Sequence, residues 1–397
     1  MSLLAGISLT LGNTLAASTT PMNFKRSTCQ NMDYKPPPPP PPGNTNAGLK
    51  PSMFHSHGRS HYYQLPATSG APKGTLLVLP GCARWGPGFW PYGSPGCDDC
   101  VGLTEDVAHT KQALARGYAI LVGWPVDLSY PNQYCWSAKD DGDTITKILL
   151  QFLEAFRLRT KPVYVLGASS GGSVALKFQS MLEAQRVPVH VSGILAEVST
   201  NLEVQHFAPK SKRHPPIVWV SMSYPNEIKK ARTRVADYKK YAPAAMVVSD
   251  VHKVLPTYFS DRHPRISPLR SAHLVDAMHS IKLLRTDGIF AYDIKENKGW
   301  IGKLYTAAPW LKQSPEFALG PSKKSAILQA MQVAQAGHEH VCDYLTAALM
   351  WFEQSGATNF TDLVRKYRVV KPSALTMERQ LPGAEPTPVS AFAYGHR

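Results

Sequence analysis

One short stretch joins an apolar, strand-forming run to a helix-forming run through a turn rich in glycine and serine. It reads Val163-Tyr-Val-Leu-Gly-Ala-Ser-Ser-Gly-Gly-Ser-Val-Ala-Leu176. In a sharp strand-to-helix turn of the form G-x-S-x-G, the serine takes a strained backbone conformation and its hydroxyl stands clear of the sheet edge. The pattern predicts a nucleophile elbow with Ser169 as candidate nucleophile, flanked by Gly167 and Gly171. The alternative is a tightly packed turn that does no chemistry.

Apolar strand-like runs alternate with helix-like runs from about residue 75 onwards. Apolar strands separated by helices are typical of a parallel sheet that is covered on both faces. The fold class predicted is therefore α/β: a doubly wound, mostly parallel sheet with helices on both faces. The expected strands are 75–79, 119–124, 163–166, 189–196, 217–220 and 245–248, and the expected helices are 105–116, 140–159, 172–185, 227–241 and 340–354.

The ends of the chain differ in composition from its middle. Residues 1–50 read as a signal or targeting segment followed by a linker, because Pro36 to Pro42 form an unbroken proline run that favours a stiff polyproline II spacer. Residues 51–370 are the expected folded domain. Within it, residues 252–335 break the alternation and are interpreted as an insertion, or lid, over the carboxyl edge of the sheet. Residues 371–397 are expected to be a loosely ordered tail.

The first eighteen residues are apolar, with small residues at their end, and resemble a signal peptide without a basic start. Because Ser and Thr are plentiful and no acidic residue precedes Asp33, a plastid transit peptide is the alternative. The sequon Asn359-Phe-Thr361 is compatible with secretion. We expect a secreted protein or one of the endomembrane lumen, and the sequence offers no unbroken apolar run of transmembrane length.

Six cysteines, an even number, favour disulfides and an oxidising compartment. Cys97-Asp-Asp-Cys100 lies in a loop rich in Gly and Pro, which favours a structural disulfide. A redox pair would need a helix N-terminus, and a zinc site would need a second pair of similar spacing.

The chain is basic, with a formal net charge of +15. Residues 205–303 hold 18 Lys and Arg against 8 Asp and Glu. No nucleic-acid recognition motif accompanies this excess, so a solvated basic face or attraction to an anionic surface, polymer or substrate is expected.

A serine hydroxyl needs a general base, and the base needs an acid that orients it. In this fold class the order along the chain is Ser, acid, His, with the histidine between the last strand and the last helix. Gly337-His-Glu-His-Val341 lies there and offers His338, favoured, and His340.

The acid is expected after strand 217–220, where the loop Ser221-Met-Ser-Tyr-Pro-Asn-Glu227 contains no Asp. Glu227 is favoured over Glu197, which ends the strand before it. Asn226 and Asp250 are further alternatives.

The oxyanion hole should be built from backbone N–H groups. Ser170 would supply one of them. Cys82 or Ala83, in the loop after strand 75–79, would supply the other, with Gly81 allowing close approach. Trp85, Phe89, Trp90 and Trp136 either line an acyl pocket or anchor these loops in the core.

These features together resemble the α/β-hydrolase fold over about residues 75–355. A narrower resemblance is to an uncharacterised hydrolase-like family of plants, algae and protists. It is carried by Leu79-Pro-Gly-Cys82, Gly96-Cys-Asp-Asp-Cys-Val-Gly-Leu-Thr-Glu105, Cys135-Trp136, Leu166-Gly-Ala-Ser-Ser-Gly-Gly172, Leu255-Pro-Thr-Tyr-Phe-Ser-Asp-Arg262 and His338-Glu339. Where such proteins usually have a short motif ending in Asp, this chain reads Ser223-Tyr-Pro-Asn-Glu227.

The sequence therefore predicts a serine hydrolase that cleaves a small-molecule or lipid ester, or a related acyl bond, through an acyl-enzyme. Such chemistry needs no cofactor and no metal. The alternatives are a non-catalytic binding protein of the same fold and a disulfide-exchange protein that uses Cys97 and Cys100.

Overall fold

In the computed structural model, the residues that can be described are 46, 48–67, 70–84, 86–125, 134–320 and 325–377. The predicted targeting segment, the proline run and most of the predicted tail lie outside them, as do Cys29 and Trp85. By contacts the chain divides into Met1–Pro37 and Pro38–Arg397, and all that follows concerns the second unit.

The described part of the chain forms an eight-stranded sheet of order β1-β2-β4-β3-β5-β6-β7-β8. All neighbours from β4 to β8 are parallel, while β1 pairs with β2, and β2 with β4, in antiparallel fashion. The predicted fold class is confirmed by this order and by these directions. The strands are β1 (Ser52–Ser56), β2 (Arg59–Gln64), β3 (Gly74–Leu79), β4 (Tyr118–Val122), β5 (Val163–Ala168), β6 (Val191–Glu197), β7 (Ile217–Met222) and β8 (Ala244–Ser249).

Helices cover both faces of the sheet because successive strand residues point to opposite sides. Leu76 and Val78 of β3 pack in one core with α1 (Thr104–Ala115), α9 (Leu345–Glu353) and α10 (Phe360–Tyr367). Leu77 and Leu79 of the same strand pack in the opposite core. That second core receives α2 (Gly142–Ala155), α3 (Ser170–Ala184) and α4 (Pro225–Tyr238).

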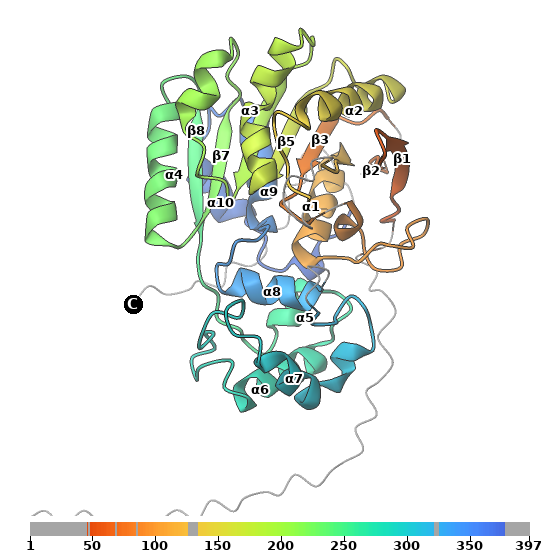
Figure 1. Cartoon of the computed structure of the whole chain (residues 1–397), viewed down its shortest axis with the longest axis vertical. Helices are drawn as coiled ribbons and strands as arrows, with labels where there is room; N and C mark the ends of the chain where they lie inside the picture. The colour runs from red at the N-terminus through yellow and green to blue at the C-terminus, as the bar shows by residue number, and fades with distance from the viewer. Residues whose placement is uncertain are drawn as a thin grey trace, which may run out of the picture. The chain divides into compact units, whose positions relative to one another are not determined.

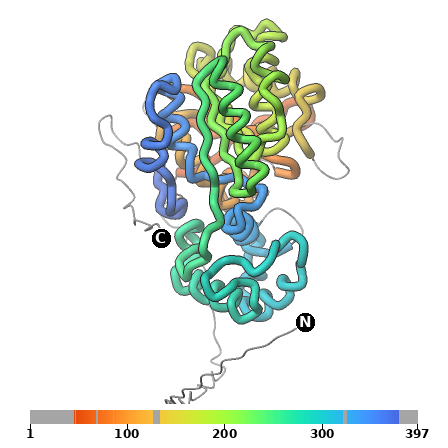
Figure 2. Tube along the Cα trace, turned by 90° about the vertical axis from the view of Figure 1, so that its left-hand side faces the viewer, coloured from red at the N-terminus to blue at the C-terminus, as the bar shows by residue number. Residues whose placement is uncertain are grey.

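Between β8 and α9 the chain forms a group of helices with an apolar core of its own. They are α5 (Tyr258–Arg262), α6 (Pro268–Ser280), α7 (Trp300–Ala307) and α8 (Ala326–Ala334). Figures 1 and 2 both show this group beside the end of the sheet from which the chain leaves β8. That end holds the carboxyl ends of the parallel strands, where ligands bind in open α/β sheets.

Several predicted bounds were wrong. The expected strands begin only at residue 75, whereas β1 and β2 precede them. The expected helix 340–354 begins at Leu345, after a short 3-10 turn, Cys342–Tyr344, and α10 follows it. Residues 371–377, assigned to a loose tail, include a 3-10 turn, Pro372–Ala374, and Lys371 pairs with Asp261 of α5 at 3.3 Å.

Four cysteines form two disulfides, Cys82–Cys135 and Cys97–Cys100. The second confirms the expected structural disulfide, and both of its cysteines are buried. Cys342 is a buried free thiol, so the expectation drawn from the even cysteine count does not extend to it.

Candidate active site

Ser169 lies between β5 and α3 at a sharp turn. Its backbone has φ 53° and ψ −117°, a region that residues with a side chain rarely adopt and that costs roughly 1–3 kcal/mol. A Cβ on Gly171 would overlap the carbonyl of Leu79, and one on Gly167 would overlap the carbonyl of Gly171. The glycines therefore allow the close packing that holds Ser169 in its strained conformation.

The loop between α8 and α9 brings a histidine to this serine. His338 is exposed, and its Nε2 lies 2.7 Å from the Ser169 Oγ. The loop turns sharply because Ala336, just before it, has a φ of 51°. The two side chains are 169 residues apart in sequence and meet within hydrogen-bonding distance. A neutral imidazole in this position accepts the serine proton.

Glu227, in the first turn of α4, lies near this pair. Thr200 Oγ1 donates a hydrogen bond to it, and the Lys230 Nζ donates another at 3.0 Å. Partial burial raises the pKa of Glu227, but these bonds and the charges of Lys230 and His338 outweigh it and hold that pKa below its usual value. Glu227 is thus a carboxylate whose charge interacts with His338.

The other residues predicted as alternatives for the acid role have different surroundings. Glu197 is fully buried and accepts hydrogen bonds from the His109 Nε2 at 3.1 Å and the Val341 N–H at 3.3 Å. Its carboxylate therefore serves a different histidine. Asn226 and Asp250 are exposed.

The predicted oxyanion loop lies beside Ser169, because a Cβ on Gly81 would stand 3.5 Å from that of Ser169. The Ala83 N–H donates to the Tyr134 carbonyl at 2.8 Å and is not available as an oxyanion donor, which corrects that expectation. Cys82 and Ser170 remain, and they are in contact: the Cys82 Sγ lies 3.3 Å from the Ser170 Oγ.

The aromatic residues near the oxyanion loop belong to the protein interior. Phe89 and Trp90 are fully buried, and Trp136 is nearly so. The backbone N–H of Trp136 donates to the Ser170 Oγ at 3.2 Å. These side chains anchor loops, and the acyl-pocket interpretation does not fit Phe89 or Trp90.

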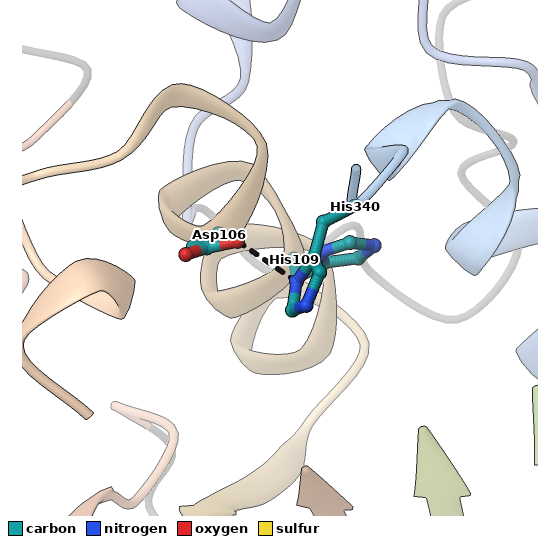
Figure 3. A group of neighbouring side chains, drawn as sticks. All are labelled: Asp106, His109 and His340. Atoms are coloured by element: carbon teal, nitrogen blue, oxygen red, sulfur yellow. Dashed lines mark ion pairs between the residues drawn. The ribbon is translucent and has the colours of Figure 1, made fainter. Parts of the chain in front are cut away.

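His340, the second candidate base, points into the protein. It is 2% exposed, and its Nδ1 lies 2.9 Å from the Asp106 Oδ1 of α1. Burial lowers the pKa of His340, but Asp106, Glu197 and Glu339 outweigh this and raise it to about 9. Figure 3 shows Asp106 and His109 on one helix with His340 approaching from another segment. Sequence reasoning missed Asp106 and His109, although their i, i+3 spacing on an expected helix places them on one face.

Two further contacts connect the loop that carries His338 (residues 335–341, here called the histidine loop) to the predicted oxyanion loop. Arg84 forms a buried ion pair with Glu339, and the Gly81 N–H approaches the His340 Nε2 at 3.4 Å. The loop that carries His338 and the loop after β3 are thus connected directly.

Comparison with solved structures gives distant matches only. An esterase/lipase from an uncultured bacterium is 12% identical with a TM-score of 0.35, over 56% of this chain and 82% of that one. A monoglyceride lipase of Saccharomyces cerevisiae is 11% identical with a TM-score of 0.35, over 53% and 89%. Brefeldin A esterase, a bacterial homologue of human hormone-sensitive lipase, is 13% identical with a TM-score of 0.33, over 50% and 68%.

These similarities are too distant to indicate a reaction, and the fold class follows instead from the strand order. Neither the models of protein families nor the curated protein sequences give a match. Among the described residues, no helix is both long and apolar enough to cross a membrane.

Proposed function

We propose that the protein is a serine hydrolase that cleaves an ester or a related acyl bond. The observation that carries the proposal is the 2.7 Å approach of the His338 Nε2 to the Ser169 Oγ at a strained elbow. A hydroxyl at such a turn gains reactivity only when a base is within reach, and here the base is in place without rearrangement.

In the proposed reaction the Ser169 Oγ attacks the substrate carbonyl while its proton passes to His338. The imidazolium then gives that proton to the leaving alcohol as the ester bond breaks, and an acyl-enzyme remains. Water attacks the acyl-enzyme and gives one proton to His338, which passes that proton to the Ser169 Oγ as the acyl bond breaks, so that the acid and the free serine are released. Glu227 stabilises the imidazolium through its negative charge.

The developing oxyanion would be stabilised by backbone N–H groups of Ser170 and Cys82. The Ser170 N–H is at the first position of α3 and donates to no partner within the described chain. Each such donor typically supplies roughly 3 kcal/mol to the transition state. The Cys82–Cys135 disulfide and the Arg84–Glu339 pair hold the loop in place.

The basic surface gives the proposal a direction for substrates. Helix α4 begins at the site and carries four cations, Lys229, Lys230, Arg232 and Arg234, and Lys239 and Lys240 follow directly after it. This charge favours anionic substrates or attachment to an anionic surface.

Two disulfides support an oxidising compartment, and we propose that the protein is secreted or lies in the endomembrane lumen. We also propose that this chain belongs to the hydrolase-like family of plants, algae and protists that its sequence resembles.

The experiment that tests the proposal is intact-mass labelling with a fluorophosphonate, in which the activated serine oxygen displaces fluoride from phosphorus. Wild type should gain one adduct, and both Ser169→Ala and His338→Ala should gain none. If the wild type gains no adduct, the hydrolase proposal fails and the fold serves a binding function.

A further inference from the structure

Behind the proposed active site lies a buried group that we call the histidine cluster: Asp106, His109, His340 and Glu197. Each of the four side chains is at most 2% exposed. One ligand atom from each of Asp106, His109 and His340 lies within 4.8 Å of the others. Figure 3 shows these three side chains converging from two segments of the chain.

The polar atoms at the centre of this cluster lack hydrogen-bond partners. Within the described residues, no acceptable hydrogen bond reaches Asp106 Oδ2, His109 Nδ1 or His340 Nδ1. The His340 Nδ1 forms an ion pair with the Asp106 Oδ1 at 2.9 Å, so Asp106 Oδ2 and His109 Nδ1 are the two atoms without a hydrogen-bond or ion-pair partner among the described residues. Buried polar atoms are almost always satisfied, so these two neighbouring exceptions require an explanation.

The second nitrogen of His109 has the partner typical of a metal-binding imidazole. Its Nε2 pairs with the Glu197 carboxylate at 3.1 Å. If Nε2–H donates to this carboxylate, Nδ1 carries the lone pair. Ligating histidines characteristically donate their other N–H to a carboxylate in this way, which fixes the tautomer and the ring orientation.

The charges of the cluster leave room for two positive charges. Asp106, Glu197 and Glu339 are buried carboxylates, and among described residues one arginine, Arg84, pairs with one of them, Glu339. The excess of two negative charges matches the charge of one divalent cation bound at the lone pairs of the rings. The two rings lie close enough to share such an ion, with their centroids 6.0 Å apart.

A neighbouring group, which we call the arginine cluster, shows what a balanced set looks like. Glu105 and Asp343 lie there with Arg262 and Arg368. Two carboxylates face two guanidinium groups, so no further cation is needed. The histidine cluster differs because its imidazole nitrogens offer lone pairs, whereas the guanidinium groups of the arginine cluster carry permanent positive charges.

We propose that Asp106, His109 and His340 bind one divalent transition-metal ion, with Zn²⁺ as the leading candidate, and that the ion holds α1 to the histidine loop. Two imidazoles and a carboxylate are ligands that suit Zn²⁺. Ligands about 2.0–2.1 Å from a tetrahedral Zn²⁺ lie roughly 3.3 Å from one another. The observed separations, from 2.9 Å to at most 4.8 Å, bracket that value.

The ion would bind the His340 Nδ1 on the side that faces Asp106, and His340 would then carry its proton on Nε2. The contact from the Gly81 N–H to that nitrogen, already long at 3.4 Å, would open. The ion would be structural and takes no part in the proposed hydrolysis.

The test begins with the metal content of the full chain, expressed without an affinity tag and purified without chelator. Mass spectrometry of the metals should find about one Zn²⁺ per chain. Asp106→Asn and His109→Gln should each retain less than about a tenth of it. His61→Gln, at a buried histidine of β2 that contacts the Ser56 carbonyl, is the matched control and should retain all of it.

Two results would overturn the proposal: no bound metal in wild type after refolding with added Zn²⁺, or equal metal in wild type and both cluster variants, which is adventitious binding. If the variants do not fold, X-ray absorption on wild type decides instead. Two imidazoles in the metal shell support the site, and a shell without them refutes it. Ser169→Ala should keep its metal, so this test is independent of the proposed hydrolysis.

Discussion

His338 and His340 are two residues apart in one loop but occupy opposite environments. His338 is exposed and reaches Ser169, whereas His340 is buried against Asp106 on α1. The chain bends at His338 and Glu339, and the side chains of His338 and His340 reach different partners, so one loop serves two sites. The difference teaches that position along the chain identifies a pair of candidate histidines, and that the partners of each decide what it can do.

The largest effect on activity should come from a substitution at the exposed site, where His338 meets Ser169. Ser169→Ala should lower kcat/KM for a simple ester by about 10⁴-fold or more, because the nucleophile is lost. The midpoint temperature of thermal unfolding should change little, since the substitution removes only one half-buried hydroxyl group. Ser180→Ala, farther along α3, is the control. Residual activity within tenfold of wild type would assign the reaction to another residue.

Glu227→Gln should have the next largest effect on turnover. Loss of the carboxylate charge that stabilises the His338 imidazolium should lower kcat by roughly 10²-fold or more, with KM little changed. Asp237→Asn, on the same helix and paired with Lys240 at 3.2 Å, should behave as wild type. A normal kcat for Glu227→Gln, together with a reduced one for Asp250→Asn, would move the acid role to Asp250.

The two histidines should separate in stability measurements. His340→Gln leaves Asp106 buried without its ion-pair partner, so the free energy of unfolding should fall by about 3 kcal/mol and the bound metal should be lost. His338→Gln should leave both quantities as in wild type, because the side chain is exposed. Denaturant unfolding and metal analysis of the two variants measure this directly. Equal stability of both would remove the distinction drawn between them.

A variant of the arginine cluster separates the effect of a lost buried ion pair from the effect of a lost metal. Arg262→Met leaves Glu105 and Asp343 with an uncompensated charge and should also lower the free energy of unfolding by about 3 kcal/mol. Its metal content should match wild type, since none of the proposed ligands has changed. If Arg262→Met lost the metal, binding of the ion would depend on the arginine cluster as well as on the histidine cluster.

Local signals allowed the sequence to predict the centre of the fold. The elbow is encoded within a few residues, and the residues of strands β3 to β7 are buried, apart from the half-buried Ser192 of β6. Strands β1 and β2 were missed because β1 is partly exposed at the sheet edge and both carry polar residues.

Contacts between distant segments could not be predicted. The last helix starts at Leu345 rather than His340, because the Val341 and Cys342 N–H groups donate to Glu197 and Glu105 instead of extending a helix. The pairing of Asp106 with His340 likewise joins residues more than 200 positions apart, and no local pattern marks it.

The smallest effect on activity should come from the buried disulfide that lies outside both sites. Cys97→Ser combined with Cys100→Ser should change kcat/KM by less than about twofold, because the proposed reaction uses Ser169, His338 and Glu227 and neither sulfur of this buried disulfide. Stability should fall by about 2 kcal/mol, as expected for a short closed loop. A disulfide-exchange protein would give the reverse, with activity abolished here and intact in Ser169→Ala. Assaying both variants on one ester and one dithiol substrate therefore tests whether the exposed serine or the buried sulfurs carry the function.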